Sequence, residues 1–354
     1  SATAISQRSS SAATRRASTR SGVTSAAVRS GVASVRRISR AIARASSLSA
    51  GLAALALAKA ARLGAPARVA AALALEAFRG NLTPLGEAAG AARPQPGQQA
   101  AAAELRALLD GSLLLQPGQA RRLQDPISLR CVAPVHGSFK AALAFAEAAL
   151  DPEINGAADN PLILVAPDPA SGDEAISTGN FHTPLLALSL DTLGQAAAQV
   201  AGLSLARASR LVQNRFSGLP DNLTALGSGA SGFAPLMKIG ESLYGEIRHL
   251  ALPVSGEMRW GADGTEDDVT HTPLAAKKLG QLLERLALLL GLELLVGAQA
   301  LELRAPEQVA PRVAAALSAV RRHVAPLEED RSLSAELRAL GAAVERGELA
   351  GLVA

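Results

Sequence analysis

Apolar residues recur at helical spacing along most of the chain after residue 47. The pattern predicts helices because positions three and four apart fall on one helical face. Four shorter helices and three long ones are expected, covering residues 48–63, 67–80, 101–112 and 138–150, and then 184–213, 234–252 and 273–304. The last stretch has so few polar positions that it is predicted to lie at the centre of a bundle. The predicted fold class is therefore all-α, a long-helix bundle, with residues 48–354 forming one helical domain.

Turn-forming residues interrupt this pattern in three places. Residues 93–99 form a loop rich in Pro and Gly, and residues 115–137 hold three prolines without a clean period. The second stretch indicates an ordered loop or a broken helix. Residues 151–182 are rich in turn formers but contain two short apolar runs, which are typical of a small hairpin.

Composition points to an aliphatic core. The chain is 49% apolar and only 2% aromatic, and Ala and Leu, which favour helices, dominate it. The most apolar segment, residues 286–303, is interrupted by Glu293 and Glu302, so no membrane span is expected. The single cysteine, Cys131, excludes an intrachain disulfide and suits a reducing cytosol, which predicts a cytoplasmic location. Helices this apolar also predict a homo-oligomer with helices packed across subunits.

Charge divides the chain into two unequal parts. Residues 1–75 hold 12 Lys and Arg and no acid, so the remainder of the chain is acidic. Residues 1–47 consist mainly of Ser, Ala, Thr and Arg, and this composition predicts a disordered basic leader. Three interpretations stay open: an organelle transit peptide, a nucleic-acid-binding arm, or out-of-frame translation of GC-rich DNA. The leader has no aromatic residue to stack on a base, so nucleic acid is not the expected partner.

Four polar loops between the helices contain candidate site residues, because a helical enzyme places its chemistry on loops held by rigid helices. They are residues 123–131, 155–162, 177–184 and 261–279. Each loop also has an ordinary structural interpretation, such as a surface ion pair, a turn before proline, a helix cap or a solvated acidic turn. No pair of His, Cys, Asp and Glu falls at a convincing ligand spacing, so no metal site is expected.

Taken together, the loops and their neighbours resemble one family. The segments that carry the resemblance occur in family order from about residue 49 to the C-terminus: "ALALEAFRGN", "RPQPGQQAAAAELRALLDGS", "QDPISLRCVAPVHG", "ADNPLI", "GNFHTP", "SGLP", "EDDVTHTPLAAKKL" and "LEEDRSL". They are similar to the aromatic amino acid ammonia-lyases, which include histidine ammonia-lyase and its phenylalanine, tyrosine and aminomutase relatives. The resemblance implies a carbon–nitrogen lyase and a homotetramer. It also implies that ammonia leaves an aromatic amino acid substrate, such as histidine, and an α,β-unsaturated acid forms.

The resemblance also implies residue roles. Arg130 matches the arginine that binds the substrate carboxylate, a task suited to a planar guanidinium. Gln124 and Asn160 match amides that orient the electrophile and the carboxylate, and Phe181 matches an aromatic residue beside the electrophile. Glu266 matches a position that is Glu in histidine-specific members, where it could bind an imidazole N–H or assist proton transfer.

Two positions depart from the family pattern. Ile127 stands where the family usually has Tyr, so a hydroxyl near the electrophile is missing. Asp268 stands where the histidine-specific form has His. Both departures weaken the prediction of histidine as substrate.

The family makes its electrophile, a methylidene-imidazolone ring, from its own Ala-Ser-Gly tripeptide, so no bound cofactor is expected. Ala230, Ser231 and Gly232 spell this tripeptide but match a later family segment, and Phe233 follows where the ring-forming context has Asp. They are predicted to form a helix entry instead. The family's ring-forming region and its base-bearing tyrosine loop find no match in the chain. A shifted frame over residues 4–11 permits Gly-Asp-Leu-Ala-Ala-Leu-Val-Val, which predicts a reading-frame break near residue 48.

Three functions are therefore weighed. The first is an ammonia-lyase that is impaired because its electrophile-forming region is missing. The second is a non-catalytic helical oligomerisation module or pseudoenzyme. The third is a chain that complements a separate N-terminal lyase fragment.

Overall fold

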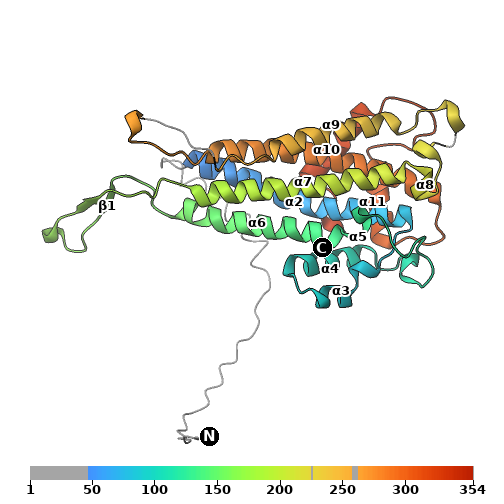
Figure 1. The fold of residues 1–354 in the computed structure, drawn as a ribbon, viewed down its shortest axis with the longest axis horizontal. Helices are drawn as coiled ribbons and strands as arrows, with labels where there is room; N and C mark the ends of the chain where they lie inside the picture. Colours follow the sequence, from blue (N-terminus) through green and yellow to red (C-terminus); the bar gives the residue numbers. More distant parts are fainter. Residues whose placement is uncertain (1–46, 225, 257–261, 354) are drawn as a thin grey trace, which may run out of the picture.

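The structure is a computed structural model, and it describes residues 47–224, 226–256 and 262–353. The predicted leader, residues 1–47, lies outside these described residues except for Ser47, which begins the first described helix. Figure 1 shows the described part as an elongated bundle of helices with a small hairpin at one end.

Helices account for nearly all of the regular structure. Their bounds are α2 (Ser47–Phe78), α3 (Glu87–Ala92), α4 (Pro96–Leu108), α5 (Ile127–Arg130), α6 (Val132–Asn155), α7 (Pro184–Leu211), α8 (Asn214–Ser217), α9 (Ala234–Leu250), α10 (Thr272–Arg304), α11 (Pro311–Arg321) and α12 (Ser334–Arg346). The strands are β1 (Leu162–Leu164) and β2 (Glu174–Ile176). The predicted all-α long-helix bundle is confirmed, and α7, α9 and α10 end within two residues of the predicted bounds.

Helix α10 forms the centre of the bundle, as its sequence predicts. It packs against α2, α7, α9, α11 and α12, and its residues from Leu289 to Leu301 are all buried. Both α2 and α10 are long and apolar enough to cross a membrane by composition alone. In α10, 83% of the most apolar window is buried inside the bundle, so contacts with neighbouring helices account for its apolar character.

Three helix boundaries differ from the predicted ones. One helix, α2, replaces the two predicted over residues 48–80, because Pro66 removes a single backbone donor while the buried face continues past it. Helix α4 starts inside the predicted loop, since Pro96 is preorganised for a first turn and the Gln95 side chain caps it by accepting from the Gln98 N–H. Helix α6 starts at Val132, six residues earlier than predicted.

The start of α6 is fixed by a close crossing with α4. A Cβ at Gly97 would lie 2.4 Å from the Gly137 carbonyl oxygen, and a Cβ at Gly137 would lie 2.4 Å from the Gln98 nitrogen. Only a residue without a side chain allows the two backbones to approach this closely. This contact holds the first turns of α6, which directly follow the α5 turn.

The turn-rich segment after α6 forms the predicted small hairpin. Strands β1 and β2 pair in antiparallel register, with Leu162 opposite Ile176 and Leu164 opposite Glu174. Figure 1 shows the hairpin projecting beyond the ends of α6 and α7. It therefore marks the end of the bundle where the segments before α7 and α10 also lie.

Candidate active site

Gln124 and Arg130 lie together at the α5 end of the bundle. With its amide oxygen turned toward Arg130, Gln124 accepts from both Nη1 and Nη2 at 3.2 Å. The Nε atom of Arg130 is buried and has no hydrogen-bond partner. No carboxylate of the described residues lies within 4.0 Å of this guanidinium. Arg130 thus keeps a positive charge and an unused donor, which suits an incoming carboxylate.

A buried ion pair supports the short helix that carries Arg130. Arg207 of α7 and Glu293 of α10 are both fully buried, with Nε to Oε1 at 2.5 Å and Nη2 to Oε2 at 3.0 Å. The third nitrogen of Arg207, Nη1, donates to the Ser128 carbonyl of α5 at 3.1 Å. One guanidinium therefore fastens α5 to two helices of the core.

The other candidate residues lie in the segments that precede α7 and α10. The Asn160 Oδ1 atom accepts from the Thr178 N–H at 2.9 Å, and this bond closes the base of the hairpin. Phe181 is 48% exposed and meets the neighbouring His182 ring edge to face. Glu266 is exposed and makes no hydrogen bond or ion pair to the described residues. No described residue therefore pairs with its exposed carboxylate.

Two side-chain contacts join these segments. The Nε2 atom of His182 lies 3.1 Å from the Asp268 Oδ2 atom, and the Thr183 hydroxyl lies 2.7 Å from the Thr272 hydroxyl. The Asp268 carboxylate thus partners His182 across 86 residues of sequence. Asn160, Phe181 and Glu266 consequently belong to one end of the molecule.

The two groups of candidate residues lie at opposite ends of α6. Arg130 directly precedes this helix and Asn160 follows it. A helix of 24 residues is about 36 Å long. One copy of the chain therefore brings Gln124 to Arg130, but it does not bring this pair to Asn160, Phe181 or Glu266. A site that contains all five residues needs more than one copy.

The Ala230–Gly232 tripeptide lies directly before α9, at the predicted helix entry. The Ser231 and Gly232 N–H groups donate to the two carboxylate oxygens of Asp330 at 2.6 and 2.9 Å. Ala230 has an extended backbone, with φ −101° and ψ 145°. For the Gly232 nitrogen to attack the Ala230 carbonyl, it would have to leave Asp330. The local geometry thus fits a helix entry and does not fit a ring-forming turn.

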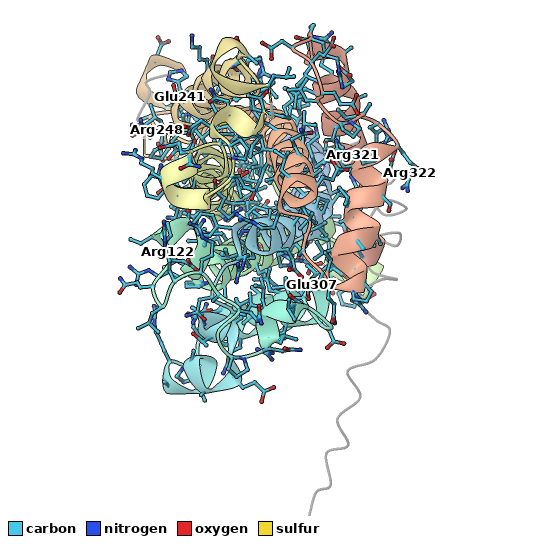
Figure 2. The ribbon with its side chains drawn as sticks, turned by 90° about the vertical axis from the view of Figure 1, so that its right-hand side faces the viewer. Arg122, Glu241, Arg248, Glu307, Arg321 and Arg322 are labelled. Carbon is cyan, nitrogen blue, oxygen red and sulfur yellow. The ribbon has the colours of Figure 1, made fainter. Side chains whose placement is uncertain are left out.

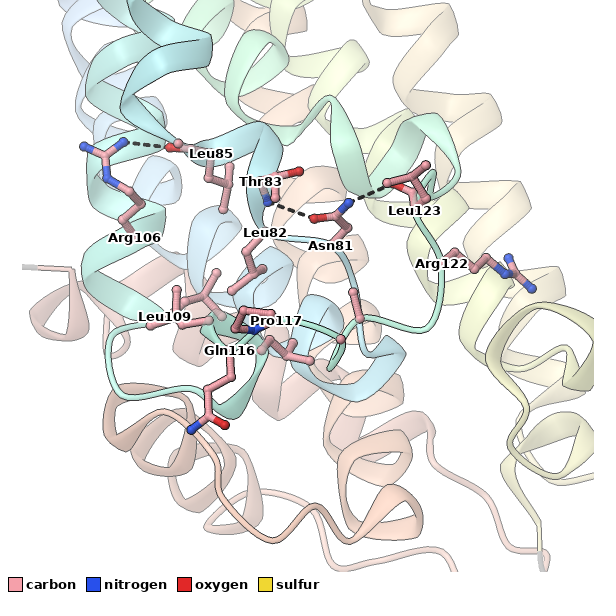
Figure 3. A pocket seen from close by; sticks show the side chains of 15 residues that line it. Asn81, Leu82, Thr83, Leu85, Arg106, Leu109, Gln116, Pro117, Arg122 and Leu123 are labelled. Atoms are coloured by element: carbon pink, nitrogen blue, oxygen red, sulfur yellow. Dashed lines mark hydrogen bonds between the residues drawn. The ribbon is translucent and has the colours of Figure 1, made fainter.

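A cavity of about 620 Å³ lies beside the Gln124 loop but contains none of the five candidate residues. Leucines are the most frequent residues in its lining and include Leu82, Leu109 and Leu114. Figure 3 shows Arg106 bonded to the Leu85 carbonyl and Arg122 directed away from the cavity. The cavity is therefore an apolar recess with little polar chemistry of its own.

Sequence reasoning gave His136 only an ordinary structural role, and the residue lies on the first turns of α6. It is 1% exposed, and its Nε2 atom has no hydrogen-bond partner. Burial, followed by the charges of Arg207 and Arg68, lowers the pKa of His136 well below its usual value of 6.5. In the sequence it falls in residues 115–137, where no regular period signals a buried helical position.

Acid is expected to destabilise the protein through His136. The unfolded chain binds a proton near pH 6.5 and the folded chain does not. The free energy of unfolding should therefore fall by about 1.4 kcal/mol per pH unit below that value, until the folded pKa is reached. Urea unfolding of His136→Leu between pH 7 and pH 5 should show a flatter profile than the unaltered chain. The exposed His249→Leu is the control, and an equal slope in His136→Leu would contradict the assignment.

Comparisons with known proteins agree with the arrangement of these segments. A family model described as "Aromatic amino acid lyase" matches residues 39–322. The chain is 42% identical over 298 residues to the histidine ammonia-lyase of Anaeromyxobacter sp. (strain K), covering 83% of this chain and 58% of that protein. It is also 42% identical over 264 residues to the histidine ammonia-lyase of Symbiobacterium thermophilum, covering 74% and 51%. The chain thus spans between 51% and 58% of these curated relatives.

Solved structures of similar proteins share the fold. Histidine ammonia-lyase from Trypanosoma cruzi matches with a TM-score of 0.78 and 28% identity, over 88% of this chain and 57% of that one. Tyrosine aminomutase from Streptomyces globisporus matches with a TM-score of 0.80 and 29% identity, over 87% and 61%.

Proposed function

We propose that this chain, which belongs to the aromatic amino acid lyase family, takes part in the elimination of ammonia from an aromatic amino acid. In this reaction the bond between Cα and nitrogen breaks, a proton leaves Cβ, and an α,β-unsaturated acid forms. The proposal rests on the surroundings of the Arg130 guanidinium. This group is held by Gln124, it has a buried unpaired Nε, and no described carboxylate neutralises it. A substrate carboxylate would supply the missing partner.

Histidine is the first substrate to test. Two similar proteins carry the name histidine ammonia-lyase, and the exposed carboxylate of Glu266 could accept a hydrogen bond from an imidazole N–H. Phe181, which is half exposed, would cover the ring of the substrate from one side. Ile127 and Asp268 depart from the histidine-specific pattern, so tyrosine and phenylalanine belong in the same assay.

The active form would be a homo-oligomer, and by family resemblance a tetramer. Two observations support this proposal. Arg130 directly precedes α6, and Glu266 lies with the segments at the other end of this helix. A site that contains both residues therefore requires a second copy of the chain. Phe181, Leu185 and Leu188 also expose apolar surface at the start of α7, which packing between copies would cover.

The electrophile would come from outside Ala230–Gly232. A methylidene-imidazolone ring, when present, supplies the electron sink that lets ammonia depart. Since Asp330 holds the Ser231 and Gly232 N–H groups, no step is assigned to a ring at this tripeptide. The residues of this chain would bind the carboxylate through Arg130, orient it with Gln124 and Asn160, and exchange a proton at Glu266.

An ultraviolet assay tests the proposal, because the conjugated product absorbs at longer wavelength and more strongly than the amino acid. The chain would be mixed with histidine, tyrosine or phenylalanine, first alone and then with the N-terminal region of the Anaeromyxobacter relative. We expect product from at least one of these mixtures, and none when the chain carries Arg130→Gln. Absence of product from every mixture would favour a non-catalytic oligomerisation module. Product only after addition of the N-terminal region would identify a complementing chain.

A further inference from the structure

Six arginines gather around α8 at the end of the bundle that Figure 2 faces, where Arg122 is labelled. They are Arg79, Arg121, Arg122, Arg210, Arg215 and Arg304, and none has a carboxylate of the described residues within 4.0 Å. The charge of one acid, Asp125, acts on Arg121 and Arg122, but this side chain is buried and accepts from the Asn81 N–H. The six positive charges of the group therefore outnumber the carboxylates beside it, which are Asp125 and Asp221; the latter accepts from the Asn214 N–H at the start of α8.

Three of the six have an evident structural use. Arg121 donates to the Phe216 carbonyl at 2.9 Å, Arg304 donates to the Ser217 carbonyl, and Arg79 donates twice to a carbonyl of the neighbouring loop. Such bonds satisfy carbonyls at a helix C-terminus. Burial, and then the charges of Arg121 and Arg79, lower the pKa of Arg304 to about 10. These arginines hold α8 in place and add positive charge behind it.

The other three surround a single phenyl ring, and we call Arg122, Arg210 and Arg215 the Phe216 cluster. Their guanidinium carbons lie 5.9, 4.5 and 4.8 Å from the ring centroid of Phe216. Arg210 makes no hydrogen bond or ion pair to the described residues, and Arg215 is exposed and donates only to Gln213. Stacking on the ring fixes the three charges while most of their N–H donors stay unused.

We propose that the Phe216 cluster is a binding site for a compact polyphosphate anion, such as pyrophosphate or the diphosphate group of a nucleotide. Three guanidinium groups around one ring can be reached together by a single small group, and each offers a fork that matches phosphate oxygens. Pyrophosphate carries about three negative charges at neutral pH, which matches the three guanidinium charges of the Phe216 cluster. Arg122 gives one donor to the Arg215 carbonyl at 3.0 Å, so the cluster keeps several but not all of its donors for a ligand. An amino acid substrate is a zwitterion, and its single carboxylate matches Arg130 instead.

A nucleic acid fits the cluster less well. Sequence-tolerant binding of single strands relies on aromatic faces that stack on bases. Phe216 is already covered by guanidinium groups, and Phe78, the other ring beside Arg122, is fully buried. The cluster would therefore bind its ligand through the phosphate groups, and a base would add no contact.

Calorimetric titration of the full chain at low ionic strength tests the site. We expect pyrophosphate and ADP to bind with similar affinity, orthophosphate to bind more weakly, and added salt to weaken all three. Arg210→Gln combined with Arg215→Gln should weaken pyrophosphate binding by about tenfold or more. The affinity of the Arg210→Lys/Arg215→Lys variant for pyrophosphate should lie between those of the unaltered chain and the double Gln variant. Lysines keep the two charges but lose the planar guanidinium forks.

The matched control is Arg322→Gln with Arg338→Gln. Both residues are exposed and make no side-chain bond to the described residues, and the change in net charge is the same. Figure 2 shows Arg322 on the opposite side of the molecule from Arg122. If the double Gln variant does not fold by circular dichroism, Arg215→Gln alone supplies the test, since this residue is exposed.

Three results would overturn the proposal. One is absence of pyrophosphate binding to the unaltered chain, and another is an equal loss of affinity in the control variant. The third is dissociation of an oligomer by the Arg210 and Arg215 changes without any pyrophosphate binding, which would make the cluster a subunit interface. None of these results depends on lyase activity, so the site and the proposed function can fail separately.

Discussion

Replacing Glu293 by leucine is expected to lower the free energy of unfolding by about 3–5 kcal/mol, because the change leaves a charged arginine unpaired in the core. Arg207 and Glu293 both have 0% side-chain exposure, so water cannot replace the lost partner. The guanidinium would still donate to the Ser128 carbonyl, but two of its bonds would vanish. Urea unfolding followed by circular dichroism measures the loss.

The double variant Arg207→Met/Glu293→Leu should recover most of this stability. It removes both charges together, and a well-packed apolar pair of similar volume often replaces a buried ion pair without net loss. The remaining deficit should reflect the Ser128 carbonyl, which loses its donor. Recovery in the double variant separates the cost of an unpaired charge from the cost of a cavity.

A surface pair provides the comparison. Arg285 and Glu246 also lie within hydrogen-bond distance, at 2.6 Å, but their side chains are 37% and 49% exposed. Glu246→Leu should therefore change the free energy of unfolding by no more than about 1 kcal/mol. An equal effect of Glu246→Leu and Glu293→Leu would contradict the role given to the buried pair.

The sequence predicted the long helices because their periodicity is sustained. Over 20 or more residues the apolar spacing outweighs local exceptions, and α7, α9 and α10 were located within two residues. Boundaries near proline were less predictable. Residues 48–63 and 67–80 were predicted as two helices, yet tertiary packing on both sides of Pro66 carries α2 through it.

Hydrophobic periodicity could not predict which residue pairs with Glu293 in the buried ion pair. Glu293 was visible as one of two acids that interrupt the most apolar segment, residues 286–303. Its partner lies 86 residues away on another helix, and no local pattern links the two. The same holds for His182 and Asp268, whose contact joins segments that also lie 86 residues apart.

The sequence could identify the residues of the candidate site, but it could not predict how they are arranged in space. Family order identified Arg130, Asn160 and Glu266 as chemically relevant. Their separation follows from the path of the chain, because the 24 residues of α6, a length of about 36 Å, lie between Arg130 and Asn160. Only a structure reveals that residues assigned to one site lie at two ends of the same molecule.

The strongest functional prediction follows from this separation and concerns mixtures of inactive chains. In the preparation that is active in the ultraviolet assay, Arg130→Gln and Glu266→Gln should each lower kcat/KM by roughly 100-fold to 1000-fold. The first change removes the charge that binds the carboxylate, and the second removes the charge proposed to exchange a proton.

Coexpression of the two variants should restore activity to about a quarter of the unaltered level. If Arg130 and Glu266 of one site come from different copies, random assembly gives a quarter of the sites both native residues. A site built within one chain would never contain both, and the mixture would stay as inactive as its components. Mixing Arg130→Gln with the double variant Arg130→Gln/Glu266→Gln is the control, since no chain then supplies the guanidinium. Recovery in the first mixture, absent from the control, would support a shared site, whereas no recovery would contradict it.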